Sequence, residues 1–187
     1  MYNVMIDIET GGTGPLAPIL SIAAVLFDLN TGEIGPKFYA VIDLNSELAL
    51  GAKPDGDTIY WLLSQSAEVR EALTQKPENN AVVLKRLTNF IKKHSSKGLD
   101  HVQVWGNGST FDNTITRTAY QRCGLLPFWV FWNDCDVRTA VKMGRAIGFN
   151  PKKEMPFEGE KHHPVDDAIH QIKYLTAIWK RITAPRG

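Results

Sequence analysis

Two carboxylates at the end of an apolar stretch are the first residues of this sequence that could do chemistry. Asp7 and Glu9 close the run YNVMIDIE at residues 2–9. If this run is a strand, side chains two residues apart share a face, so both carboxylates point to one place. Two such groups repel each other unless a cation joins them. Acids that fray into water at a strand end are the alternative, but the apolar neighbours Ile6 and Ile8 favour a functional pair.

A further candidate acid follows another apolar stretch. Residues 101–105 (HVQVW) are followed by a short turn that begins at Asn107 and reaches Asp112. Sheets of α/β proteins place ligands at the carboxyl ends of strands, which makes Asp112 a candidate for the same site. The alternative is an ordinary acid at the beginning of a helix, where the helix dipole favours negative charge.

The third candidate group combines histidines with acids near the end of the chain. His162 and His163 precede Pro164, and Asp166 and Asp167 follow it. Proline is common at the first position of a helix, so both acids should lie in a first helical turn. A carboxylate there can bind a metal while a histidine on the preceding loop acts as acid or base. A surface loop before a capped helix is the alternative.

The order of these three groups resembles the DEDDh family of 3′→5′ exonucleases, which has the ribonuclease H-like fold. The resembling motifs are Asp7-Ile8-Glu9-Thr10, then Asn107 to Asp112, then His162-x4-Asp167 with Ala168. They span nearly the whole chain. Segments 61–66, 131–132 and 136–139 are similar to the branch with ribonuclease AS and the DNA exonuclease A of T-even phages. Gly11 departs from the threonine or methionine that is common after the first motif.

The resemblance implies a metal site and a general base. Two divalent ions, Mg²⁺ or Mn²⁺, would be held by Asp7, Glu9, Asp112 and Asp167. Hard cations prefer carboxylate oxygen, and two of them can stabilise the attacking and leaving oxygens of an in-line displacement. His162 would take a proton from the attacking water, because an imidazole pKa of about 6.5 suits this role near neutrality.

The resemblance also implies residues that bind the terminal nucleotide. Thr10, Gly11 and Gly12 would border it, because small residues let the backbone approach a ligand closely. Trp61 would stack on a base or contact a partner protomer. An ordinary turn for the first three residues and core packing for Trp61 remain the alternatives.

Hydrophobic patterns predict the elements that must position these residues. Strands are expected at residues 2–9, 19–28, 33–42, 101–105 and 130–135. Helices are expected at residues 57–64, 66–74, 79–94, 110–122, 137–147 and 164–181. The turn at 30–32 predicts a hairpin of the second and third strands, with the first strand antiparallel to the second. Asp136 is expected to cap a helix, and residues 148–163 are expected to form an irregular loop. The result is an α/β fold with a mixed five-stranded sheet and helices on both faces.

Composition and charge limit the class of protein. The chain has 187 residues, of which 43% are hydrophobic and 22% charged, typical of one folded domain over residues 1–187. No apolar run approaches the ~20 residues of a membrane helix, so no membrane partner is expected. A net charge of +1 argues against a broad basic groove and allows a small site for one chain end. Cys123 and Cys135, without zinc-binding spacing, indicate a cytoplasmic protein.

The leading hypothesis is a metal-dependent 3′→5′ exonuclease that releases 5′-mononucleotides from single-stranded ends. RNA is slightly favoured by the resemblance to ribonuclease AS, and DNA is the close alternative because the phage relative degrades DNA. A catalytically inactive nucleic-acid-binding accessory module and a two-metal phosphatase for small nucleotides are hypotheses of other classes. Loss of one of the five site residues would favour the inactive module, and all five are present. The resemblance further suggests a homodimer.

Overall fold

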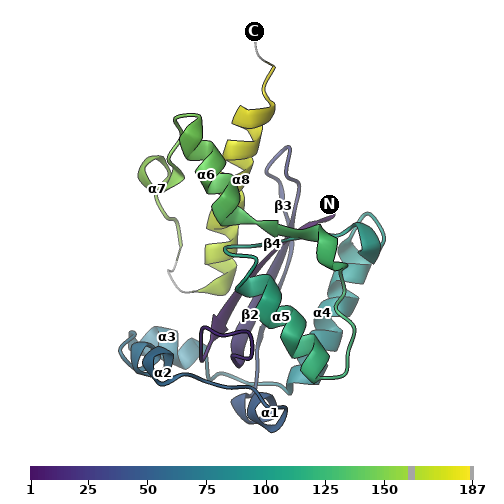
Figure 1. Ribbon diagram of the computed structural model, residues 1–187, viewed down its shortest axis with the longest axis vertical. Helices are drawn as coiled ribbons and strands as arrows, with labels where there is room; N and C mark the ends of the chain where they lie inside the picture. The colour runs from purple at the N-terminus through teal and green to yellow at the C-terminus, as the bar shows by residue number, and fades with distance from the viewer. Residues whose placement is uncertain (160–162, 186–187) are drawn as a thin grey trace.

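A mixed five-stranded sheet forms the centre of the computed structural model, which describes residues 1–159 and 163–185. Its strands are β1 (Asn3–Thr10), β2 (Ile19–Phe27), β3 (Ile34–Val41), β4 (Gln103–Gly106) and β5 (Asp134–Asp136). They lie in the order β3-β2-β1-β4-β5 (Figure 1). β2 pairs antiparallel with β1 and β3, whereas β4 pairs parallel with β1 and β5. The hairpin and the antiparallel first pair are therefore confirmed, and β1, β4 and β5 end at the same edge of the sheet.

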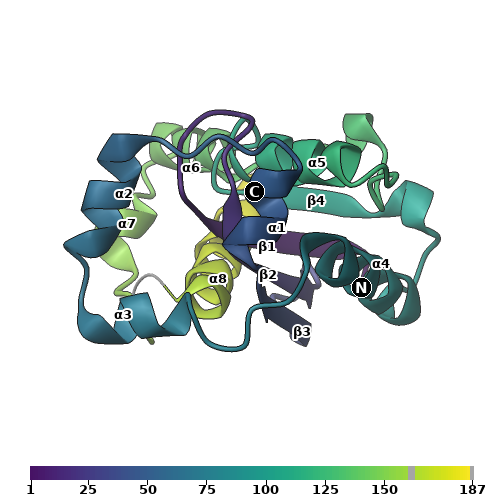
Figure 2. The same ribbon diagram turned by 90° about the horizontal axis from the view of Figure 1, so that it is seen from below.

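Helices cover both faces of this sheet. The helices are α1 (Leu44–Ala49), α2 (Gly56–Leu63), α3 (Ala67–Ala72), α4 (Asn80–His94), α5 (Asp112–Arg122), α6 (Val137–Ala146), α7 (Pro151–Glu154) and α8 (Pro164–Thr183). Figure 2 shows α8 and α4 on opposite sides of β1, β2 and β3. In both views α3 lies beside the beginning of α8. No helix in the described part of the chain is long and apolar enough to cross a membrane.

The pleat of β1 divides its side chains between two cores. Val4, Ile6 and Ile8 join the core formed with α4 and α5. Met5 joins the other core, formed with α6 and α8. Because successive strand residues alternate between faces, Asp7 and Glu9 lie on the same face as Met5 and point toward α8.

The expected strand at residues 130–135 is wrong in its position. Phe131–Asn133 form a short 3₁₀ helix, and β5 begins only at Asp134. Side-chain hydrogen bonds fix this turn: Asn133 Nδ2 donates to the Asp100 carbonyl at 2.8 Å, and Trp129 Nε1 donates to Asp134 Oδ1 at 2.6 Å. The strand was predicted from the apolar character of residues 130–135 alone. In the structure, Phe131 is 67% exposed and does not belong to a buried strand.

Two short helices lie where no helix was expected. α1 begins after Asp43, whose carboxylate accepts hydrogen bonds from the N–H groups of Asn45 and Ser46. α7 begins with Pro151 inside the stretch that was expected to be an irregular loop. Both are shorter than two turns, so neither shows the repeated apolar spacing that identifies a helix in a sequence.

Candidate active site

Four carboxylates meet at the carboxyl edge of the sheet. Asp7, Glu9 and Asp167 can each offer an oxygen so that the three atoms lie within 4.8 Å of one another. Asp112 lines the same cavity of about 280 Å³, which we call the acid cavity. The structure thus brings together all four residues that were predicted to bind metal.

Three local features of the chain place these four acids. Asp7 and Glu9 share one face of β1, and Asp167 lies in the first turn of α8. Asp112 opens α5, which packs closely on β4 because Gly106 has no side chain: a Cβ there would lie 2.8 Å from the Cβ of Asp112. The chain therefore delivers the four side chains from one strand and two helix beginnings.

Burial raises the pKa values of three of these carboxyls, and for Asp7 and Glu9 repulsion by neighbouring acids adds to the effect. Burial raises the pKa of Asp7 well above its ordinary value, and the neighbouring charge of Asp112 adds to the effect. Burial, then the charges of Asp167 and Asp112, raises the pKa of Glu9 to about 8. Burial raises the pKa of Asp112 to about 7. Ionised together, these groups require a cation between them.

The donor set fits a hard divalent cation. Every candidate ligand atom is a carboxylate oxygen, the type that Mg²⁺ and Mn²⁺ prefer. Gln171, one turn after Asp167, donates from Nε2 to Asp7 Oδ1 at 2.7 Å and so fixes the orientation of that carboxylate. Sequence reasoning missed Gln171, although the i, i+4 spacing from Asp167 places the two on one helix face.

Arg138 borders the acid cavity from α6. Its guanidinium lies against Gly108, whose φ is +128°, and a Cβ on that glycine would come within 3.2 Å of Arg138 Cζ. Asp136 caps α6 as expected, since its Oδ1 accepts the Thr139 N–H at 2.6 Å. The other oxygen of Asp136 accepts the Ser109 N–H at 2.7 Å. The turn before α5 is therefore held against the beginning of α6.

A second cavity adjoins the acid cavity on the side of β1 and α2. We call it the Trp61 cavity; its volume is about 410 Å³, and its lining includes Glu9, Thr10, Gly12, Trp61 and Phe111. Ile8, Glu9 and Phe111 also line the acid cavity, so the two cavities adjoin at these residues. Trp61 is 45% exposed, which leaves a large aromatic surface beside the carboxylates.

Hydrogen bonds and close packing fix the conformation of the glycine-containing turn after β1. Thr10 is buried, and its hydroxyl donates to the Gly12 carbonyl at 2.6 Å. Gly11 is absent from the lining of the Trp61 cavity, and a Cβ at Gly11 would lie 3.0 Å from Pro18. Asp55 ties this turn to α2 by accepting the N–H groups of Thr13 and Thr58. Among the predicted nucleotide-binding residues, Thr10, Gly12 and Trp61 share one cavity and Gly11 supports it from behind.

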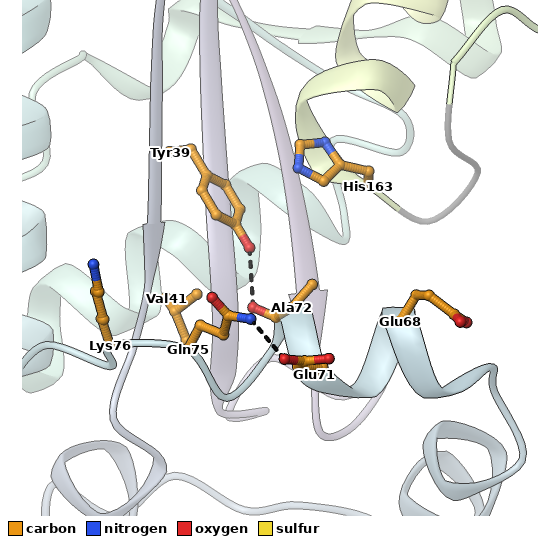
Figure 3. A pocket seen from close by; sticks show the side chains of 8 residues that line it. All are labelled: Tyr39, Val41, Glu68, Glu71, Ala72, Gln75, Lys76 and His163. Atoms are coloured by element: carbon orange, nitrogen blue, oxygen red, sulfur yellow. Dashed lines mark hydrogen bonds between the residues drawn. The ribbon is translucent and has the colours of Figure 1, made fainter.

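The predicted general base, His162, lies outside the described residues. Its neighbour His163 occupies the N-cap position of α8 without a capping hydrogen bond from its side chain, and its ring lies 5.4 Å from the ring of Tyr39. Figure 3 shows His163 above a different cavity of about 520 Å³, which Tyr39 and Glu71 also line. His163 does not line the acid cavity.

Comparison with known proteins places this site in a family. The family model described as "3′-5′ exoribonuclease Rv2179c-like domain" matches residues 2–179. The "Exodeoxyribonuclease" of Enterobacteria phage T4 is 24% identical over 165 residues, which cover 76% of this chain and 71% of the phage protein.

Solved structures confirm the ribonuclease H-like fold. The zinc-bound complex of E. coli ExoI with single-stranded DNA matches with a TM-score of 0.70 and 19% identity. It covers 98% of this chain, which spans only 41% of the ExoI chain. The nuclease domain of 3′hExo, a DEDDh family member bound to rAMP, matches with a TM-score of 0.60 and 16% identity, over 97% of this chain and 92% of that one. Since the family model covers nearly the whole chain, the protein belongs to the 3′-5′ exonucleases of the exoribonuclease Rv2179c-like domain family.

Proposed function

We propose that this protein is a metal-dependent 3′-5′ exonuclease that removes 5′-mononucleotides from single-stranded nucleic acid, with RNA as the favoured substrate. The observation that carries the proposal is the meeting of Asp7, Glu9, Asp112 and Asp167 in one cavity. Burial makes Asp7, Glu9 and Asp112 unfavourable in the ionised form without cations, and a nuclease that uses two metal ions needs cations at this place.

The acid cavity and the Trp61 cavity have different roles in this reaction. Asp7, Glu9, Asp112 and Asp167 would hold two divalent ions, Mg²⁺ or Mn²⁺. When bound, the ions stabilise the negative charge that develops on the phosphate oxygens. His162 takes the proton from the attacking water, the role of a general base.

The Trp61 cavity receives the terminal nucleoside. Trp61 and Phe111 offer aromatic surface for stacking on its base. The turn formed by Thr10, Gly11 and Gly12 brings backbone close to its sugar, and the buried Thr10 hydroxyl keeps that turn in shape. Glu9 lines both cavities. It therefore lies where the sugar of the terminal nucleotide is joined to the scissile phosphate.

RNA is favoured because the matching family is described by exoribonuclease activity. DNA is the second candidate, because the phage T4 relative is an exodeoxyribonuclease. The free thiols of Cys123 and Cys135 support a further proposal, that the protein works in the reducing cytoplasm. The homodimer stays a prediction.

Digestion of matched RNA and DNA tests this function. Both strands carry a 5′ label and the same sequence, and the products are sized after incubation with Mg²⁺. We expect a ladder that shortens from the 3′ end, faster on RNA, and no reaction after chelation. The Asp7→Asn variant should lose at least about 10³-fold in rate, because metal ions contribute several kcal/mol to the transition state. Glu33→Gln, at an exposed position, is the matched control. Full activity of the chelated enzyme would refute the metal mechanism.

A further inference from the structure

A third cavity lies beside the acid cavity and is lined by positive charge. Arg138, Lys142 and Arg145 line it from α6, and its volume is about 350 Å³. We call it the α6 cavity. Its described lining contains no acidic side chain. All three residues are exposed. Among the described residues, no hydrogen bond or salt bridge engages Lys142 or Arg145, whereas the charge of Arg138 acts on Asp112 in the acid cavity.

This arrangement works against the stability of the helix. Arg138 and Lys142 are four residues apart, and Lys142 and Arg145 are three apart, so all three lie along one face of α6. Like charges at these spacings repel each other and destabilise a helix. The whole chain has a net charge of only +1. Arg138 faces Asp112 in the acid cavity, but Lys142 and Arg145 have no acid beside them in the lining of the α6 cavity, and this pair therefore favours an anionic ligand.

The α6 cavity also offers an apolar surface next to its charges. Val141, Pro151 and Tyr174 form the apolar part of the lining, and all three are largely buried. Asn107 completes the lining. Cations beside aromatic and apolar surface suit a nucleotide, whose phosphate is anionic and whose base and sugar are largely apolar.

Shared residues set the order of the three cavities. The Trp61 cavity and the acid cavity share Ile8, Glu9 and Phe111. The acid cavity and the α6 cavity share Asn107 and Arg138. The acid cavity therefore lies between the other two. If the terminal nucleoside occupies the Trp61 cavity and the scissile phosphate lies at the carboxylates, the strand continues into the α6 cavity.

We propose that the α6 cavity binds the phosphates of the substrate strand on the 5′ side of the scissile bond, with Lys142 and Arg145 as its anchors. The proposal rests on the proposed exonuclease function and adds the path of the strand. It makes the enzyme prefer oligonucleotides over substrates that have only one phosphate.

A comparison of two substrates distinguishes a failure of this proposal from a failure of the exonuclease function on which it rests. One is an oligonucleotide, and the other is the p-nitrophenyl ester of a 5′-mononucleotide, whose only phosphate is the scissile one. The double variant Lys142→Ala/Arg145→Ala is compared with Lys85→Ala/Lys92→Ala, which removes two exposed charges from α4 on the far side of the sheet. Arg138 is left intact because it borders the carboxylates.

We expect the ratio of kcat/KM for the oligonucleotide to kcat/KM for the ester to fall about tenfold in the α6 variant. The slope of log kcat/KM against log salt should decrease by about 0.7 for each lost phosphate contact. The α4 variant should keep the wild-type ratio. An unchanged ratio in the α6 variant would overturn the proposal. So would a variant that only weakens inhibition by added 5′-mononucleotide, since the cavity would then hold the product. A wild-type protein that hydrolyses neither substrate would instead refute the proposed function.

Discussion

Replacing Glu9 by glutamine should stabilise the metal-free protein at alkaline pH. Burial, followed by the charges of Asp167 and Asp112, raises the pKa of the Glu9 carboxyl from 4.5 to about 8. The folded state therefore holds this proton more tightly than the unfolded chain does. The stability that this carboxyl contributes is fully present below pH 4.5 and is lost as the pH rises through about 8. The amide of glutamine does not titrate, so the variant does not lose stability at this position as the pH rises.

The size of the effect follows from the shift in pKa. A change from 4.5 to about 8, at roughly 1.4 kcal/mol per unit, gives an upper limit of roughly 5 kcal/mol. Asp112, whose pKa is raised by burial to about 7, titrates in the same range. Loss of one charge relieves its neighbour, so the separate effects do not add. We expect Glu9→Gln to raise the free energy of unfolding by about 2 kcal/mol at pH 8.5 and by less than about 1 kcal/mol at pH 5.

Urea unfolding in the presence of a chelator measures this difference. Tryptophan fluorescence is followed at pH 5 and pH 8.5 for the wild type, for Glu9→Gln and for the exposed control Glu33→Gln. Added Mg²⁺ should stabilise the wild type at pH 8.5 and should stabilise Glu9→Gln less, because the variant has lost a ligand. A Glu9→Gln protein no more stable than the wild type at pH 8.5 would show that Glu9 does not lie among buried, mutually repelling acids.

Three further outcomes are expected. His162→Ala should lower turnover by about 10²-fold, the usual scale for a lost general base, whereas His163→Ala should stay within a few-fold of the wild type; steady-state rates decide between them. Gly108→Ala should lower the free energy of unfolding by about 1–2 kcal/mol, because its φ of +128° is unfavourable for alanine and the new Cβ would touch Arg138. Gly56→Ala, where a Cβ would meet no atom within 4 Å, is the control in the same melts. A circular single strand should resist the enzyme for hours while its linear form is digested, since a circle has no 3′ end; rapid cutting of the circle would contradict exonuclease action.

The sequence alone was sufficient to predict most of the sheet and which four acids meet at its carboxyl edge. The run at residues 2–9 combined strong strand character with an alternation that placed Asp7 and Glu9 together, and the structure has both features. Asp112 and Asp167 each follow a turn that marks a helix beginning, so their positions in chain order were readable. These patterns involve residues close together in the sequence, so they can be recognised without the tertiary structure.

Features that depend on distant contacts were not predictable. The turn at Phe131–Asn133 is held by a bond from Asn133 to Asp100, 33 residues earlier, and no spacing in the sequence encodes it. The bond between Gln171 and Asp7 joins residues 164 positions apart. The charges of the α6 cavity share one helix face through local spacing, but the cavity itself forms only when Asn107, Pro151 and Tyr174 are packed beside α6. Such contacts become visible only once the elements are packed.

The alternation along β1 also protects the fold during its assembly. A slip of β1 by one residue against β2 would turn Asp7 and Glu9 into the core that Ile6 and Ile8 now occupy. Burying a carboxylate without a partner costs several kcal/mol, so chains paired in that register would be unstable. The acids therefore help to select the correct strand register before any substrate is met. An Asp7→Leu/Glu9→Leu chain would lose this discrimination and should refold with a larger fraction of misregistered, aggregating molecules than the wild type.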